Sequence, residues 1–208
     1  MLTVEAEAAR RLIRERLAGG TLPAQLEREA AGRIDPKLLA AWFKMPLRPA
    51  AVLVPLVTRK AELHMLLTER THTVRDHPGQ VAFPGGTVEP EDADLVCTAL
   101  RESNEEIGMR RDQVEVIGYL PPQAVITGYA VLPVVGFFAP EFEPIIDRRE
   151  VAGVFEVPLA YLQDFSNLIR IDRERNGVVL PTYEYHYDNH RIWGATALMI
   201  RQFVEALA

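Results

Sequence analysis

Residues 83–109 read FPGGTVEPEDADLVCTALRESNEEIGM, and this stretch decides how the rest of the chain is interpreted. Its second half carries mostly apolar side chains at helical spacing, which are Leu95, Val96, Ala99, Leu100, Ser103 and Ile107. A stripe with this period predicts an amphipathic helix over 92–107 that turns the stripe toward the protein core. Asp92 is placed to cap the start of this helix, and Gly108 is placed to end it.

Three glutamates lie within two turns of the predicted helix, at Glu102, Glu105 and Glu106. At about 100° per residue, Glu106 falls roughly 60° from the middle of the stripe and Glu102 roughly 100°, while Glu105 points almost directly away. Glu102 and Glu106 are thus neighbours beside the buried face, where two like charges repel unless they share a cation. We therefore predict a Mg²⁺ or Mn²⁺ site with Glu102 and Glu106 as inner ligands and Glu105 as an outer or shared ligand.

A glutamate-rich helix is ordinarily a solvated surface, and the residues around it are what favour a ligand site here. We expect Gly85 and Gly86 to form a turn that lets the backbone approach a ligand closely and point a carbonyl at the metal. Arg101 stands next to the first glutamate and can orient a carboxylate through hydrogen bonds. This arrangement is typical of a site that hydrolyses a phosphoanhydride.

At these residues the sequence resembles the Nudix hydrolase family, whose box is written G-x5-E-x7-R-E-U-x-E-E-x-G-U with U aliphatic. The second half of the box matches at Arg101, Glu102, Glu105, Glu106, Gly108 and Met109. The chain is one residue longer than the box between Gly86 and Arg101, Asp92 replaces or displaces the upstream glutamate, and Ser103 stands at an aliphatic position. The resemblance implies a Nudix-like α/β/α sandwich with a mixed sheet and a catalytic role for the matching residues, and it leaves the role of Asp92 open.

The preceding residues 66–86, LLTERTHTVRDHPGQVAFPGG, are similar to the extended motif of the coenzyme A pyrophosphatase branch, L-L-T-x-[TR]-[SA]-x3-R-x3-G-x3-F-P-G-G. Thr71 stands where this motif usually has Ser or Ala, and the segment 191–197, RIWGATA, resembles a second motif of these enzymes. The resemblance spans roughly residues 48 to 205. It implies metal-dependent in-line attack of water on the pyrophosphate of coenzyme A, giving 4′-phosphopantetheine and 3′,5′-ADP.

Two further groups of residues are candidates for the same site. Arg70, His72, Arg75 and His77 form a cationic segment, and a substrate with three phosphates needs such partners. Arg70 and Arg75 are predicted to bind substrate together with Gly85 and Gly86; Arg75 is favoured because it occupies the arginine position of the motif, and the alternative is a structural salt bridge. Glu150 is either a fourth carboxylate and general base or a solvated loop charge.

Composition agrees with a single globular domain that has an N-terminal extension. The chain has 208 residues, of which 48% are hydrophobic and 25% charged, so it can bury a full core. We expect a helical extension over 1–46 and the phosphate-handling domain over 47–208. The net charge of −6 argues against non-specific nucleic-acid binding. The single Cys97 cannot form an internal disulfide, and with neither a membrane-spanning stretch nor a signal peptide we expect a cytoplasmic protein.

The pattern along the chain is that of an α/β protein. Helices are expected at Glu5–Leu17, Pro23–Ala31, Pro36–Phe43, 92–107, 159–165 and 195–207. Strands are expected at Ala50–Val57, Leu63–Thr68, Gln113–Leu120, Val131–Phe138 and Val151–Val157, with a half-exposed strand or hairpin arm at Thr182–Tyr187. The N-terminal helices are either a packed cap or an arm of a homodimer.

Three functions are compatible with these residues. The first is a coenzyme A pyrophosphatase, and the second is a hydrolase of another nucleoside diphosphate derivative such as NADH or ADP-ribose. The third is a non-catalytic nucleotide-binding regulator, which would have no need of three clustered carboxylates. Aromatic side chains at Tyr183, Tyr185, Tyr187 and Trp193 could stack on adenine or could serve only to pack the sheet.

Overall fold

The computed structural model describes residues 3–59, 61–72, 79–139 and 141–208. The helices are α1 (Val4–Leu17), α2 (Leu26–Gly32), α3 (Pro36–Trp42), α4 (Leu95–Ile107), α5 (Leu159–Gln163) and α6 (Gly194–Leu207), with 3-10 turns at Arg111–Gln113 and Phe165–Asn167. The strands are β1 (Arg48–Arg59), β2 (Glu62–Arg70), β3 (Val81–Ala82), β4 (Gly85–Thr87), β5 (Val114–Tyr119), β6 (Gln123–Val125), β7 (Tyr129–Phe138), β8 (Val151–Pro158), β9 (Ile169–Arg175), β10 (Val178–Tyr187) and β11 (His190–Trp193).

These strands form two sheets, an eight-stranded mixed sheet and a three-stranded antiparallel sheet. The path through the large sheet is β3-β2-β1-β7-β5, in which β1 runs parallel to β7 and antiparallel to β2. Three short or peripheral strands join this path, because β4 pairs with β1, β6 with β7 and β8 with β2. The order in the small sheet is β11-β10-β9.

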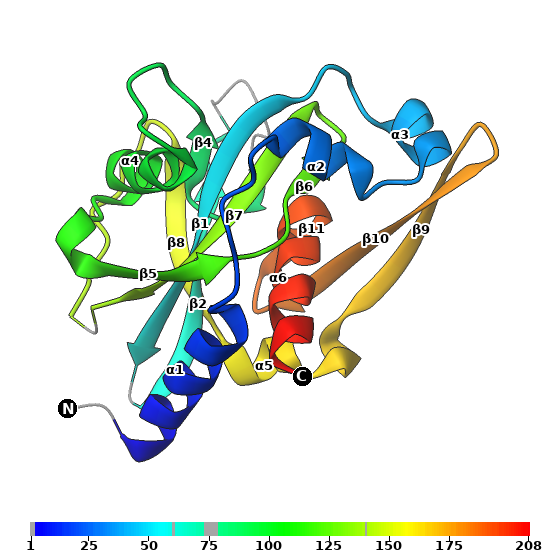
Figure 1. Ribbon diagram of the computed structural model, residues 1–208. Helices are drawn as coiled ribbons and strands as arrows, with labels where there is room; N and C mark the ends of the chain where they lie inside the picture. The colour runs from blue at the N-terminus through cyan, green and yellow to red at the C-terminus, as the bar shows by residue number, and fades with distance from the viewer. Residues whose placement is uncertain (1–2, 60, 73–78, 140) are drawn as a thin grey trace.

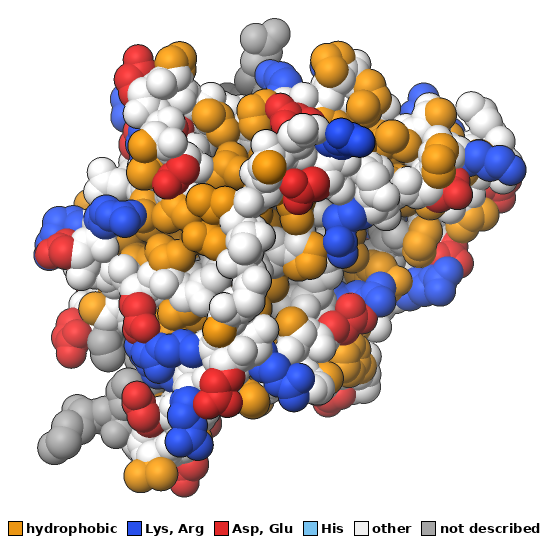
Figure 2. Space-filling model, in the orientation of Figure 1, with side chains coloured by type: hydrophobic (Ala, Val, Ile, Leu, Met, Phe, Trp, Pro, Cys, Tyr) orange, Lys and Arg blue, Asp and Glu red, His pale blue; other side chains and the backbone are white. Residues whose placement is uncertain are grey.

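Helices cover both faces of the large sheet, which makes the fold an α/β/α sandwich (Figure 1). Strand β1 supplies both cores because its side chains alternate: Val54 and Leu56 join the core that contains α6, and Ala51 and Leu53 join the core that contains α4. Figure 2 shows hydrophobic side chains between α4 and β5 on the face in view. No helix in the described residues is long and apolar enough to cross a membrane.

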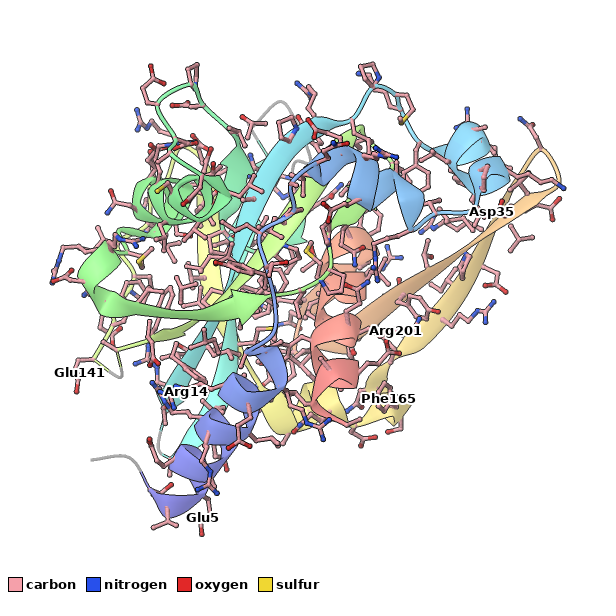
Figure 3. The ribbon with its side chains drawn as sticks, in the orientation of Figure 1. Glu5, Arg14, Asp35, Glu141, Phe165 and Arg201 are labelled. Carbon is pink, nitrogen blue, oxygen red and sulfur yellow. The ribbon has the colours of Figure 1, made fainter. Side chains whose placement is uncertain are left out.

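The N-terminal helices pack against the chain's own sheets. Ile13 and Leu17 of α1 belong to the α6 core, and Arg14 points from α1 toward β5, where it donates two hydrogen bonds to Glu115 at 2.8 and 2.9 Å (Figure 3). The indole Nε1 of Trp42 at the end of α3 donates to the carbonyl of Val178 at 3.0 Å. These contacts make the helices a packed cap on the sheets.

The mixed α/β fold predicted from the sequence is confirmed, and most predicted elements lie within a few residues of their expected bounds. Two local expectations are wrong. Helix α4 begins at Leu95, where Asp94 caps it by accepting from the amide of Cys97 at 2.8 Å, so Asp92 is not the cap. Gly85 and Gly86 do not form a turn, because they pair with Val52 and Ala51 as part of β4. Strands β3, β4, β6, β9 and β11 were not predicted.

Candidate active site

Helix α4 presents its glutamates in the orientation expected from its apolar stripe. The stripe packs on β1, and Gly108 ends the helix with a φ of 68°, a conformation that glycine adopts without strain. Glu106 is buried, Glu102 is partly buried, and Glu105 is exposed. Glu102 and Glu106 are therefore the inner pair, beside the sheet, and Glu105 lies outward.

Glu106 is the most buried carboxylate of this group, with only 3% of its surface exposed. Its Oε1 accepts a hydrogen bond from Arg70 Nη1 at 3.3 Å, and its Oε2 has no hydrogen-bond partner among the described residues. Burial raises the pKa of Glu106 to about 8; Arg70 and the backbone amide of Gly85 oppose this rise, while Glu102 and Glu150 add to it. A buried acid with one oxygen unpaired and two acidic neighbours is an electrostatic setting that a cation would stabilise.

Glu102 lies against the backbone of β4. A Cβ atom built on Gly86 would overlap the carboxylate carbon and both oxygens of Glu102, so a larger residue at position 86 would displace the end of this side chain. Gly85 has a φ of 155°, and a Cβ there would overlap the backbone of β1. Burial raises the pKa of Glu102, and Arg101 partly offsets that rise. The two glycines thus let the backbone of β4 lie close to the Glu102 carboxylate and to β1, although they belong to a strand and not to a turn.

Arg101 links the glutamates to Asp92. Its Nε and Nη2 donate to the two oxygens of Asp92, both at 3.0 Å, while its Nη1 donates to Glu102 at 3.1 Å and to Glu105 at 3.4 Å. The hydrogen bonds from Arg101 are the main cause that lowers the pKa of Asp92 to about 2. Asp92 also accepts from Thr98 Oγ1 at 2.9 Å. Asp92 therefore anchors Arg101, and Arg101 in turn holds Glu102 and Glu105 in place.

Glu150 is exposed on a loop that is fastened to both α4 and β2. The amide of Asp147 donates to the carbonyl of Glu106 at 3.0 Å, and the amide of Thr71 donates to the carbonyl of Glu150 at 2.8 Å. The charge of Glu150 contributes to the raised pKa of both Glu102 and Glu106. The charge of Glu150 thus acts on Glu102 and Glu106, although the loop that carries Glu150 and helix α4 are separate segments of the sequence.

The cationic segment is described only in part. Arg70 ends β2 and is 22% exposed beside Glu106, and His72 is exposed at the surface. Arg75 and His77 lie outside the described residues, so the substrate-binding role of Arg75 stays a prediction. Sequence reasoning missed Thr98, a fully buried polar residue on α4 that supports Asp92. A hydroxyl on the buried side of the predicted helix was the available signal.

A divalent cation fits the chemistry of these donors. Within the described ranges, no three acidic, histidine or cysteine side chains already converge as a ready metal cluster. Mg²⁺ commonly takes only one or two carboxylates from a protein and completes its shell with water and substrate phosphate oxygens. Glu106, with its unpaired oxygen, and Glu102, which has the carboxylates of Glu105 and Glu150 nearby, meet that requirement as a pair.

Comparison with known proteins gives a consistent result. The family model described as "NUDIX domain" matches residues 46–181. Two proteins called "Uncharacterized Nudix hydrolase NudL" are similar: that of Enterobacter sp. (strain 638) is 44% identical over 155 residues, covering 74% of this chain and 80% of that protein. That of Photorhabdus laumondii is 42% identical over 158 residues, covering 76% and 84%. The crystal structure of a NUDIX hydrolase from Alicyclobacillus acidocaldarius is 18% identical, covers 78% of this chain and 93% of that chain, and has a TM-score of 0.48.

Proposed function

The chain belongs to the Nudix hydrolase family, and from that premise we propose that it cleaves the pyrophosphate of coenzyme A to 4′-phosphopantetheine and 3′,5′-ADP. It is a Nudix hydrolase that acts on nucleoside diphosphate derivatives. The observation that carries the metal-dependent hydrolysis in this proposal is the buried Glu106 with its unpaired oxygen, one helical turn from Glu102 and beside the glycines of β4.

Glu102 and Glu106 are the proposed ligands of Mg²⁺ or Mn²⁺, with Glu105 as an outer or shared ligand. When bound, the cation would neutralise phosphate oxygens and lower the pKa of an attacking water. Arg70 already lies 3.3 Å from Glu106, so its guanidinium is close enough to the inner pair to bind a phosphate oxygen of the substrate. Arg101 keeps Glu102 and Glu105 in place through its anchor on Asp92.

Glu150 is the proposed general base. It is exposed and can therefore accept a proton from water and release it to solvent, whereas Glu106 is buried and paired with Arg70. The hydrogen bonds from Thr71 to the carbonyls of Glu150 and Arg149 fix the loop at the end of β2. A base at this position needs such support because proton transfer requires hydrogen-bond reach to the attacking water.

The coenzyme A assignment rests on the extended motif before FPGG. The described part of that motif surrounds the site: Thr68 Oγ1 donates to the carbonyl of Ala82 at 3.2 Å and thereby joins β2 to β3, and Arg70 contacts Glu106. The motif therefore borders the carboxylates in space as well as in sequence. Its arginine, Arg75, is the proposed contact to a further phosphate of the substrate.

The test is a substrate panel with purified protein, Mg²⁺ or Mn²⁺, and product identification by mass. We expect coenzyme A to give 4′-phosphopantetheine and 3′,5′-ADP with a higher kcat/KM than NADH or ADP-ribose. A higher kcat/KM for either competitor would refute the coenzyme A assignment and leave the Nudix activity standing. Binding of these nucleotides without turnover in either metal would instead favour a non-catalytic regulator.

A further inference from the structure

The segment 141–150, which we call the strap, leads into β8 and crosses the C-terminal end of α4. The amide of Ile145 donates to the carbonyl of Ile107 at 2.9 Å, and the amide of Asp147 donates to the carbonyl of Glu106 at 3.0 Å. Both carbonyls lie in the last turn of α4, where the helix itself supplies no donor. The strap therefore completes the hydrogen bonds of the helix at the residue that carries the buried carboxylate.

The first residues of the strap are anchored to the large sheet. Phe142 is 1% exposed, and its ring packs edge-to-face on Phe138 of β7 with the ring centroids 4.7 Å apart. The carbonyl of Phe142 accepts from Arg59 Nη2 at 2.8 Å. Arg59 ends β1, and the same Nη2 donates to Glu156 of β8 at 2.9 Å. The position of the strap over α4 is thus set before the chain reaches Asp147.

Asp147 organises the turn that carries Glu150. Its carbonyl accepts from the amides of Glu150 and Val151 at 3.0 and 2.9 Å, and its Oδ1 accepts from the amide of Arg149 at 2.9 Å. An aspartate that accepts from the amide two residues further on forms an Asx turn, which fixes the backbone that follows it. Because the amide of Asp147 also binds Glu106, one residue joins the buried glutamate of α4 to the turn of Glu150.

The contact of Asp147 with the Arg149 amide matters more than its ion pair with the Arg149 side chain. Arg149 Nε lies 3.0 Å from both oxygens of Asp147, but the Arg149 side chain is 89% exposed. Solvent screens such a pair, so it contributes little to holding the turn. The acceptor oxygen of Asp147, which asparagine would also provide, is therefore the feature on which the turn depends.

We propose that Asp147 is a positioning residue of the hydrolysis and holds Glu150 in place beside Glu102 and Glu106. The inference rests on the proposed function, in which Glu150 accepts the proton of the attacking water. Because Glu150 is exposed, packing does not fix its side chain, and the place of its carboxylate depends on the backbone of the turn. A displacement of about 1 Å in a catalytic group can lower a rate by about 10²-fold.

The test measures kcat and KM at saturating Mg²⁺ on the nucleotide that the wild type cleaves fastest, so the result does not depend on the coenzyme A assignment. Asp147→Ala removes the acceptor for the Arg149 amide and should lower kcat about tenfold with KM nearly unchanged. Asp147→Asn keeps that acceptor, and its kcat should stay within about twofold of the wild type. Arg149→Gln is the matched control: it removes the ion pair but keeps the amide, and kcat should again change less than about twofold.

A double variant links the effect to Glu150. Glu150→Gln should lower kcat about 10²-fold, and adding Asp147→Ala should cause no further loss, because the carboxylate that Asp147 positions is already gone. Losses that multiply in the double variant would overturn the proposal, since Asp147 would then act independently of Glu150. Equal losses in Asp147→Ala and Asp147→Asn would also overturn it, because they would assign the effect to the charge.

Hydrogen exchange of the Arg149 and Glu150 amides, followed by NMR, tests the turn without turnover. Exchange should be about tenfold faster in Asp147→Ala than in Asp147→Asn. Equal exchange in the two variants would overturn the role of Asp147 in the turn, whatever the enzyme cleaves. Wild-type kcat in Asp147→Ala with impaired Glu150→Gln would overturn the positioning role and leave the general base standing, whereas wild-type kcat in Glu150→Gln would remove the base from the proposed function and the positioning role with it.

Discussion

Replacing Glu106 by Gln should change how the stability of the metal-free protein depends on pH. The pKa of Glu106 is about 8 in the folded protein, against an ordinary value of 4.5 for a glutamate in water. The folded state therefore holds a proton that the unfolded state has released between these two values, and the free energy of unfolding falls as pH rises from about 5 to 8. At 1.36 kcal/mol for each pH unit, this loss amounts to about 4 kcal/mol.

The glutamine variant keeps the shape of the side chain but cannot ionise, so it should not show this loss. For a chain of this length, about 4 kcal/mol corresponds to roughly 8–16 °C in Tm. We expect the Tm of the wild type in EDTA to fall by that much more than the Tm of Glu106→Gln between pH 5 and pH 8. Below pH 8 Glu106 is protonated in the wild type as well, so the variant loses no ion pair with Arg70 over most of this range and the comparison reports the ionisation of Glu106 alone.

Thermal unfolding followed by circular dichroism at four pH values gives the comparison, with Glu105→Gln as the control. The Glu105 side chain is 58% exposed, so this variant should keep the wild-type slope. Parallel Tm curves for the wild type and Glu106→Gln would show that the burial of Glu106 does not control its ionisation. Adding Mg²⁺ at pH 8 should raise the Tm of the wild type and not that of Glu106→Gln, and hydrolysis by this variant should fall about 10²-fold.

Three further predictions concern the surroundings of the glutamates. Asp92→Asn should destabilise the protein by about 2 kcal/mol at pH 7, measured by urea unfolding, because the low pKa of Asp92 reports a favourable pair with Arg101; this difference should vanish as pH falls from 4 toward 2. Gly86→Ala should lower kcat/KM about 10²-fold because the added methyl displaces Glu102, whereas Gly153→Ala, which has open space, should leave kcat/KM unchanged. EDTA should abolish hydrolysis, and Mg²⁺ or Mn²⁺ should restore it; activity retained in EDTA would contradict a metal-dependent site.

The sequence was sufficient to predict the orientation of the glutamate helix because a long apolar stripe sets its phase. The apolar stripe places Glu106 inward and Glu105 outward, and burial in the structure follows that order. The strand β9 could not be predicted in the same way. Its residues 169–175 read IRIDRER and are mostly exposed on both faces, so no apolar alternation marks it. It forms because β10 provides a full antiparallel partner.

Tertiary pairings were also beyond local reasoning. The contact between Arg70 and Glu106 joins residues 36 positions apart, and it depends on β2 ending beside α4. The predicted N-cap of α4 was wrong for a different reason. Asp92 and Asp94 both precede the apolar stripe, and either could cap a helix. The choice between them is made by Arg101, which binds both oxygens of Asp92 and leaves Asp94 at the helix start.

The same pairing explains how the longer box remains compatible with an ordered site. Asp92 stands at the position that Gly-x5-Glu assigns to glutamate, and the extra residue lies between it and Arg101. Aspartate is one methylene shorter than glutamate, yet both its oxygens reach Arg101 at 3.0 Å, and Thr98 and the amide of Glu89 complete its hydrogen bonds. The inserted residue therefore lengthens the approach to the helix while the shorter acid keeps its hold on Arg101. Because Arg101 in turn bonds Glu102, the departure from the general pattern preserves the orientation of the proposed metal ligand.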